Sequence, residues 1–148
     1  MQQLNFEDVL NKMVEENPQY HRDAYLFLRE ALDFTQKAIT KSNKKRTREG
    51  MHITAQELLK GIREYALAVF GPMTTTVFEE WGIKSCEDFG NMVFLMVENN
   101  LLRKTEQDRP EDFKNGFSFD EAFRKPFLPS AKAPDERVIP EPSKVVQN

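Results

Sequence analysis

Four segments of the sequence carry the same helix-start signal, and this signal constrains the fold more than any other feature. In each segment a small polar residue is followed three positions later by an acidic residue. The polar side chain can accept a hydrogen bond from an unpaired amide of the first helical turn, and the acid can accept one from the backbone of the capping residue. The carboxylate also favours the helix dipole. The pairs are Asn5 with Asp8, Thr54 with Glu57, Ser85 with Asp88, and Ser118 with Glu121.

Apolar residues recur at helical spacing after the first three signals and in two further stretches. Four of the five stretches, all but residues 20–39, end at or just before proline, glycine or asparagine, residues that commonly end helices. We expect the first two helices to pack antiparallel. The pattern predicts helices over residues 6–16, 20–39, 54–70, 74–81 and 85–99.

A short β-hairpin is expected after the last of these helices. Residues 101–106 fit a strand, residues 115–116 fit an Asn-Gly turn, and residues 117–119 can pair back as a second strand. Three helices followed by a hairpin is the order found in winged-helix domains, and residues 51–119 resemble that pattern. The predicted fold class is therefore mainly α with a small β-hairpin, in which an N-terminal helix pair precedes a three-helix winged-helix-like unit.

Composition divides the chain into four parts, which we expect to form one compact domain overall. Residues 1–40 are an N-terminal helical hairpin, residues 41–50 a basic loop, residues 51–124 the winged-helix-like unit, and residues 125–148 a proline-rich flexible tail. The length of 148 residues also fits one domain.

The sequence predicts a cytoplasmic protein that does not enter a membrane. Its longest apolar run, residues 92–97, is far shorter than the roughly 20 residues of a membrane-spanning helix. The first residues lack the basic and apolar character of a secretory signal. The single cysteine, Cys86, cannot form an internal disulfide, which favours a reducing compartment.

The basic loop raises the alternative of nucleic-acid binding. Its cations could contact phosphates, but a solvated linker is the simpler interpretation, because no aromatic residues lie among them to stack on bases. Residues 51–100 contain three basic and seven acidic residues, a net charge of −4, so a winged helix there would suit a protein partner better than DNA. The candidate nucleic-acid-binding residues are Lys41, Lys44, Lys45, Arg46 and Arg48.

No set of residues typical of an active site or a metal site is recognised. His52 lies near Glu57 but has neither the second histidine nor the paired cysteines of a metal site. Cys86 would gain reactivity at a helix start, but the adjacent Glu87 and Asp88 offset this, so we expect a buried or inert thiol. We therefore expect no cofactor, no metal and no enzymatic activity.

Five phenylalanines lie within fifteen residues near the end of the structured part of the chain. One interpretation is that they cover the hydrophobic core. The other is an exposed apolar patch for a protein partner, because monomeric proteins seldom leave such patches bare. The candidate partner-binding residues are Phe113, Phe117, Phe119, Phe123 and Phe127.

Five strings within residues 6–124 stand out as a set: PQYHRDAYLFLREAL, HITAQELLKGIREYA, FGPM, EEWGIKSCEDFGNMVF and LLRKTEQDRPEDF. Together they resemble an uncharacterised conserved protein family associated with Planctomycetes and Verrucomicrobia, although glycine is expected where Ala55 stands. The resemblance implies a bacterial cytoplasmic protein. It implies no catalytic residues, because that family has no assigned activity.

These observations favour a non-enzymatic protein–protein interaction or adaptor module with an unknown protein partner. The alternative is a nucleic-acid-associated regulator that binds through the basic loop and the hairpin. An adaptor would use apolar surface and tolerate salt, whereas a nucleic-acid binder would lose affinity as salt rises.

Overall fold

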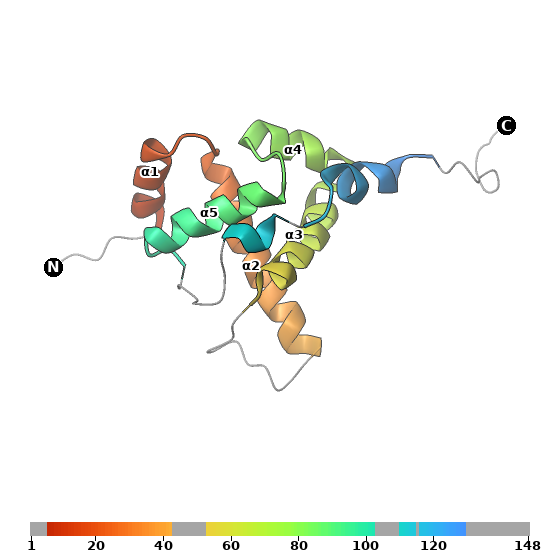
Figure 1. Ribbon diagram of the computed structural model, residues 1–148, viewed down its shortest axis with the longest axis horizontal. Coiled ribbons are helices and arrows are strands. Elements are labelled where there is room, and N and C mark those ends of the chain that lie inside the picture. Colours follow the sequence, from red (N-terminus) through yellow and green to blue (C-terminus); the bar gives the residue numbers. More distant parts are fainter. Residues whose placement is uncertain (1–5, 43–52, 103–109, 115, 130–148) are drawn as a thin grey trace.

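The computed structural model describes residues 6–42, 53–102, 110–114 and 116–129. These residues form five α-helices and four short helical turns, and they contain no β-strand (Figure 1). The mainly helical fold class is therefore confirmed. The helices are α1 Phe6–Glu16, α2 Arg22–Ser42, α3 Ala55–Phe70, α4 Thr74–Trp81 and α5 Cys86–Glu98, and the turns are η1 Gly71–Met73, η2 Pro110–Phe113, η3 Asp120–Arg124 and η4 Lys125–Phe127.

The capping residues largely fix where the helices begin and end. Thr54 Oγ1 accepts a hydrogen bond from Glu57 N at 3.1 Å, and Glu57 Oε1 accepts one from Thr54 N at 3.0 Å, as the capping pattern predicts. Gly82, with φ of 85°, ends α4, and Asn100, with φ of 61°, follows α5. Both have the left-handed backbone that glycine and asparagine tolerate.

Helix α2 begins two residues later than the sequence pattern predicts. Residues 20 and 21 are held instead by the first turn of α5 and the last residue of α4. The Tyr20 hydroxyl donates to Asp88 Oδ1 at 2.5 Å, and His21 N donates to Trp81 O at 3.0 Å. These contacts take up residues that would otherwise have formed the first turn of α2.

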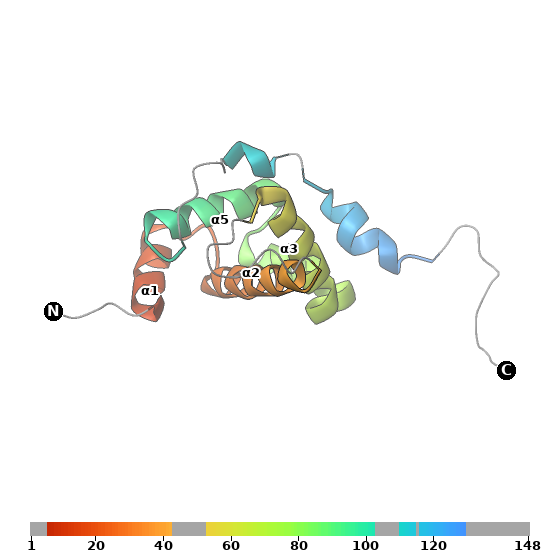
Figure 2. The same cartoon turned by 90° about the horizontal axis from the view of Figure 1, so that it is seen from below.

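The main partner of α2 is α3, which runs antiparallel to it. Phe27 lies against Tyr65 and Phe70, whereas Thr35, further along α2, meets Gly61 near the start of α3. A Cβ on Gly61 would lie 1.7 Å from Thr35 Oγ1, so only glycine allows this approach. Helix α1, by contrast, lies across the axis of α2 and not alongside it (Figure 2).

Side chains from every α-helix meet in one hydrophobic core. Burial of apolar surface is the main force that stabilises such an assembly. The largest fully buried side chains are Leu10, Met13, Tyr25, Leu28, Leu59, Ile62, Phe78, Ile83, Phe89, Met92, Met96 and Phe123.

The predicted hairpin and winged-helix-like arrangement are wrong for the described residues. Leu101 N and Leu102 N both donate to Met96 O, at 2.8 and 3.3 Å, so these residues close α5 and do not start a strand. Residues 103–109 and Asn115 lie outside the described part of the chain. Residues 117–119 lead into η3, where Ala122 N donates to Ser118 O at 2.8 Å. The helix-start signal at Ser118 therefore agrees with the structure here, whereas the strand-like alternation of residues 117–119 does not.

A chain segment that we call the strap, comprising residues 110–114 and 116–128, crosses the helices in place of a hairpin (Figures 1 and 2). Its first turn, η2, packs on α5 and α3, and η3 packs on α3, α4 and η1. The turn η4 extends helical structure into the region that composition assigns to the tail. The strap therefore covers one face of the group formed by α3, α4 and α5.

Candidate functional site

The strap carries all five phenylalanines of the predicted partner-binding cluster, but it divides them between core and surface. Phe123 is fully buried, and its ring stands edge-to-face on Phe78 with 5.4 Å between centroids. Phe113 is buried against α5, where a Cβ on Gly90 would lie 2.9 Å from Phe113 Cβ. These two rings fill the core and are not available to a partner.

Phe117 and Phe119 are half-buried at the edge of the same aromatic group. The Phe119 ring lies 5.3 Å from that of Phe123 and 5.6 Å from that of Phe78. The Arg63 guanidinium lies 5.8 Å from the centroid of the Phe117 ring, a cation–π contact on the outer side. These rings therefore seal the core and leave only their edges to solvent.

Phe127 alone among the five is exposed, at 46% of its surface, and Leu128 beside it is 45% exposed. The η3 turn leads to these two residues and packs on η1, in which Met73 is 55% exposed. The η1 turn directly follows the last turn of α3, in which Val69 is 52% exposed. Both views place η3 and the last turn of α3 toward the same end of the molecule (Figures 1 and 2). We call Val69, Met73, Phe127 and Leu128 the apolar end.

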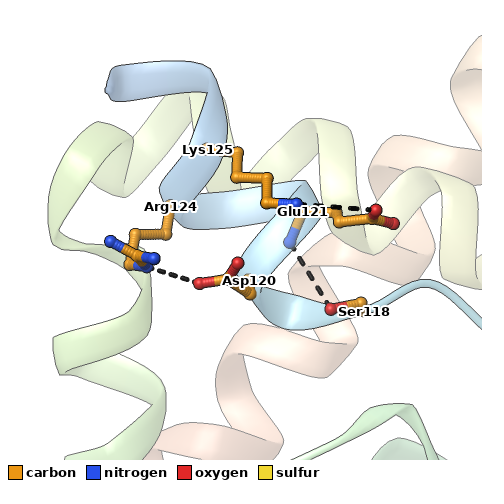
Figure 3. A network of polar contacts seen from close by, with 5 residues as sticks. All are labelled: Ser118, Asp120, Glu121, Arg124 and Lys125. Carbon is orange, nitrogen blue, oxygen red and sulfur yellow. Dashed lines mark hydrogen bonds and ion pairs between the residues drawn. The ribbon is translucent and has the colours of Figure 1, made fainter. Parts of the chain in front are cut away.

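A network of charged side chains supports the outer face of the strap next to the apolar end (Figure 3). Asp120 bonds to Arg124, and Lys125 Nζ lies 3.8 Å from Glu121 Oε2. Ser118 Oγ accepts from Glu121 N at 3.5 Å. Exposed pairs of this kind stabilise little individually, but here they hold one side of a turn whose other side carries the buried Phe123.

A second polar network, which the sequence pattern did not reveal, joins the start of α5 to the turn before α2. Besides its bond to Asp88, the Tyr20 hydroxyl accepts from Asn91 Nδ2 at 3.2 Å. Asp88 Oδ2 accepts from the backbone amides of Lys84 and Ser85, at 2.7 and 3.1 Å. Burial, together with the hydrogen bond to Asp88, raises the pKa of Tyr20. The only sequence signal was the capping pair of Ser85 and Asp88.

Cys86 lies beneath the strap, where its Sγ donates to Phe117 O at 3.4 Å. A Cβ on Gly116 would lie 2.6 Å from this sulfur, so the strap passes close over it. Burial raises the pKa of the Cys86 thiol to about 11. Since the thiolate is the nucleophile, this cysteine is poorly suited to catalysis. The expectation of a buried thiol is confirmed.

The predicted nucleic-acid-binding residues are mostly beyond the described part of the chain. Lys41 is exposed in the last turn of α2. Lys44, Lys45, Arg46 and Arg48 lie outside the described residues, as does His52.

A shallow hollow of about 600 Å³ lies over the outer face of α2. Its polar groups bond to one another: Lys37 Nζ lies 2.9 Å from Asp33 Oδ2, and the Tyr65 hydroxyl donates to Glu30 Oε1 at 3.0 Å. Paired groups of this kind do not converge on a common point, as the polar groups of an active site do. The hollow is therefore a charged surface over α2, with two internally paired sets of polar groups.

Within the described ranges, no group of three or more histidine, cysteine, aspartate or glutamate side chains is placed to hold a metal ion. The helices in that part of the chain are also too short or too polar to cross a membrane. Comparisons with protein-family models, with curated proteins and with solved structures gave no match.

Proposed function

We propose that this protein is a non-enzymatic interaction module that binds a protein partner through its apolar end. The observation that carries the proposal is the distribution of exposed apolar side chains. Of the five large hydrophobic side chains exposed in the described part of the chain, four belong to the apolar end, and only Phe94 lies elsewhere. Single exposed hydrophobics are ordinary, whereas a group of them is typical of an interaction site.

The surroundings of the apolar end support this proposal. Arg124 and Lys125 lie in the adjacent turns, and their partners Asp120 and Glu121 keep that rim charged but locally balanced. An apolar centre with a polar rim is the usual composition of a protein interface. The partner-binding residues are then Phe127 of the predicted cluster together with Val69, Met73 and Leu128. A reducing bacterial cytoplasm is part of the same proposal, and the protonated, buried Cys86 is compatible with it.

The test is an affinity capture of the full chain from a lysate of its own cells, with nuclease and high salt. Met73→Asp and Phe127→Asp place a charge in the apolar end. Phe94→Asp places the same charge at the one exposed apolar side chain outside it, where Phe94 is 42% exposed. We expect one stoichiometric protein that the wild type and Phe94→Asp retain and the other two variants lose.

Two outcomes would contradict the proposal. A partner that all three variants retain would place the interface elsewhere. Recovery of ribosomal or chromosomal material that disappears with nuclease would favour the basic residues of the loop, and charge reversal of Lys41 would then reduce that recovery.

A further inference from the structure

The apolar end includes a stretch of the chain that carries no charge. Residues 66–78 run from α3 through η1 into α4 and contain no lysine, arginine, aspartate or glutamate, although charged residues make up 30% of the sequence. Within this stretch Ala68, Pro72 and Thr76 are exposed in addition to its two members of the apolar end. The surface is therefore uncharged on the side that these helices form.

On the side formed by the strap, the charges are balanced within the chain. Asp120 bonds to Arg124, and Lys125 Nζ lies 3.8 Å from Glu121 Oε2 (Figure 3). Two cations and two carboxylates thus lie in η3 and η4, next to Phe127, and their charges cancel. A surface of this kind does not repel a second surface of the same composition, because no excess of one sign faces itself across the contact.

Phe94, the exposed large apolar side chain outside the apolar end, has a different electrostatic setting. Residues 85–102 contain three acidic residues and no lysine or arginine. Glu87 and Glu98 are exposed, and their spacing of seven and four positions from Phe94 places them on its face of α5. Two copies that met there would bring like charges together, which is unfavourable. Charge therefore opposes self-association at Phe94 and permits it at the apolar end.

We infer that the apolar end binds a second copy of this chain, in a symmetric dimer in which the same surface of each copy meets the other. A twofold contact requires a surface that is complementary to itself, and an apolar centre with balanced charge meets that requirement. The contact is small beside the roughly 20–30 residues on each side of a standard interface, so the dimer is reversible, with a dissociation constant in the micromolar range or weaker. This inference rests on the interaction surface proposed above and names its partner.

Sedimentation equilibrium of the purified full chain, over a range of concentrations, tests for the dimer. We expect a dissociation constant that changes little between low and high salt, because the contact is apolar and locally neutral. Met73→Asp and Met73→Lys should each raise it by about tenfold or more, since both bury a charge that has no partner. Phe94→Asp should leave it unchanged. A purified chain that stays monomeric would overturn the inference, as would a dimer that both Met73 variants retain.

A mixed sample locates the contact without changing any side chain of the apolar end. One chain carries a nitroxide spin label at Thr76→Cys, one helical turn after Met73, and the other is isotope-labelled at its methionine methyl groups and has no spin label. Cys86 is buried and its thiol has a raised pKa, so the reagent reacts at position 76. We expect the Met73 signal to lose intensity, and the signal of Met13, which is buried in α1, to be little changed.

The matched control moves the spin label to Glu98→Cys, at the exposed end of α5 (Figure 1). From that position the label should leave the Met73 signal of the other chain unchanged. Equal broadening from positions 76 and 98, or none from position 76, would overturn the inference.

These results can be separated from those of the affinity capture. In its own cells, the tagged chain should recover the untagged copy as its stoichiometric protein, and Met73→Asp should lose it. If the captured protein is a different one and the purified chain is monomeric, the proposed function stands and this inference fails. If the purified chain dimerises through the apolar end but Met73→Asp retains a different captured protein, this inference stands and the interface of the proposed function is wrong.

Discussion

The buried part of the strap, up to Phe123, and the apolar end, which begins on the strap at Phe127, present the same kind of side chain to opposite environments. Phe123 and Phe127 are one helical turn apart on neighbouring turns, yet the first is fully buried and the second is 46% exposed. Phe123 meets Phe78 on α4, whereas no element of the described chain covers Phe127 to that extent. One aromatic-rich segment can therefore contribute side chains both to the core and to the surface. The elements that pack against each phenylalanine determine whether it is buried or exposed.

The largest expected difference comes from truncating the two phenylalanines. Phe123→Ala removes a ring from a filled core and should lower the free energy of unfolding by about 3–5 kcal/mol. Phe127→Ala should change it by less than about 0.5 kcal/mol, because surface substitutions rarely matter more. Urea denaturation of both variants measures these values. Similar losses in the two variants would remove the distinction between strap and apolar end.

A smaller effect is expected at the contact between the strap and α5. Gly90→Ala places a methyl group 2.9 Å from Phe113 Cβ. Alanine favours the helix by about 1 kcal/mol over glycine, but the overpacking costs more, since that carbon is not the free end of a side chain. We expect a net destabilisation of about 1–2 kcal/mol by the same denaturation method. A more stable Gly90→Ala variant would mean that the strap is loosely attached.

The ionisation and reactivity of the Cys86 thiol measure how well the strap shields it from solvent. Its folded pKa of about 11 exceeds the ordinary value of 9.0 for a free thiol, so the protonated thiol contributes stability below pH 9 that is lost as pH rises toward 11. Between pH 7.5 and 9.5 the loss should be at most about 1 kcal/mol and absent in Cys86→Ala. Alkylation at pH 8 should be roughly a hundredfold slower than in the unfolded chain. Rapid alkylation of the native protein would contradict the burial of this thiol.

The smallest effect on stability is expected in the apolar end itself. Met73→Asp exchanges a side chain that is 55% exposed and should change the free energy of unfolding by less than about 0.5 kcal/mol. Its thermal unfolding should match that of Phe94→Asp. A large loss of stability in Met73→Asp alone would show that this residue belongs to the fold, and its use as a binding variant would then be unsound.

Local signals predicted most of the helices, because capping and helical spacing act within one or two turns. The boundaries of α1 and α4, the capping box of Thr54 and the left-handed Asn100 all follow from residues close in sequence. The start of α2 did not follow, because Tyr20 is held by Asp88, which lies 68 positions away. Pattern alone cannot show such a contact.

The hairpin failed for a related reason. Residues 117–119 alternate as a strand would, but Phe119 meets Phe78 and Phe89 from other helices, and Ser118 O accepts a hydrogen bond from Ala122 N in η3. For the candidate site, the sequence identified Phe127 but gave no reason to group it with Val69 and Met73, more than fifty positions earlier. Only the packing of η3 on η1 brings these positions to one end.

A photo-crosslinking experiment in living cells tests most directly whether the apolar end is a binding surface. Met73→p-benzoylphenylalanine and, separately, Phe94→p-benzoylphenylalanine would be produced in the full chain at native expression level. We expect a discrete heavier product from position 73 and none from position 94. The absence of a product from position 73, or the same product from both positions, would contradict the proposal that the apolar end is a binding surface.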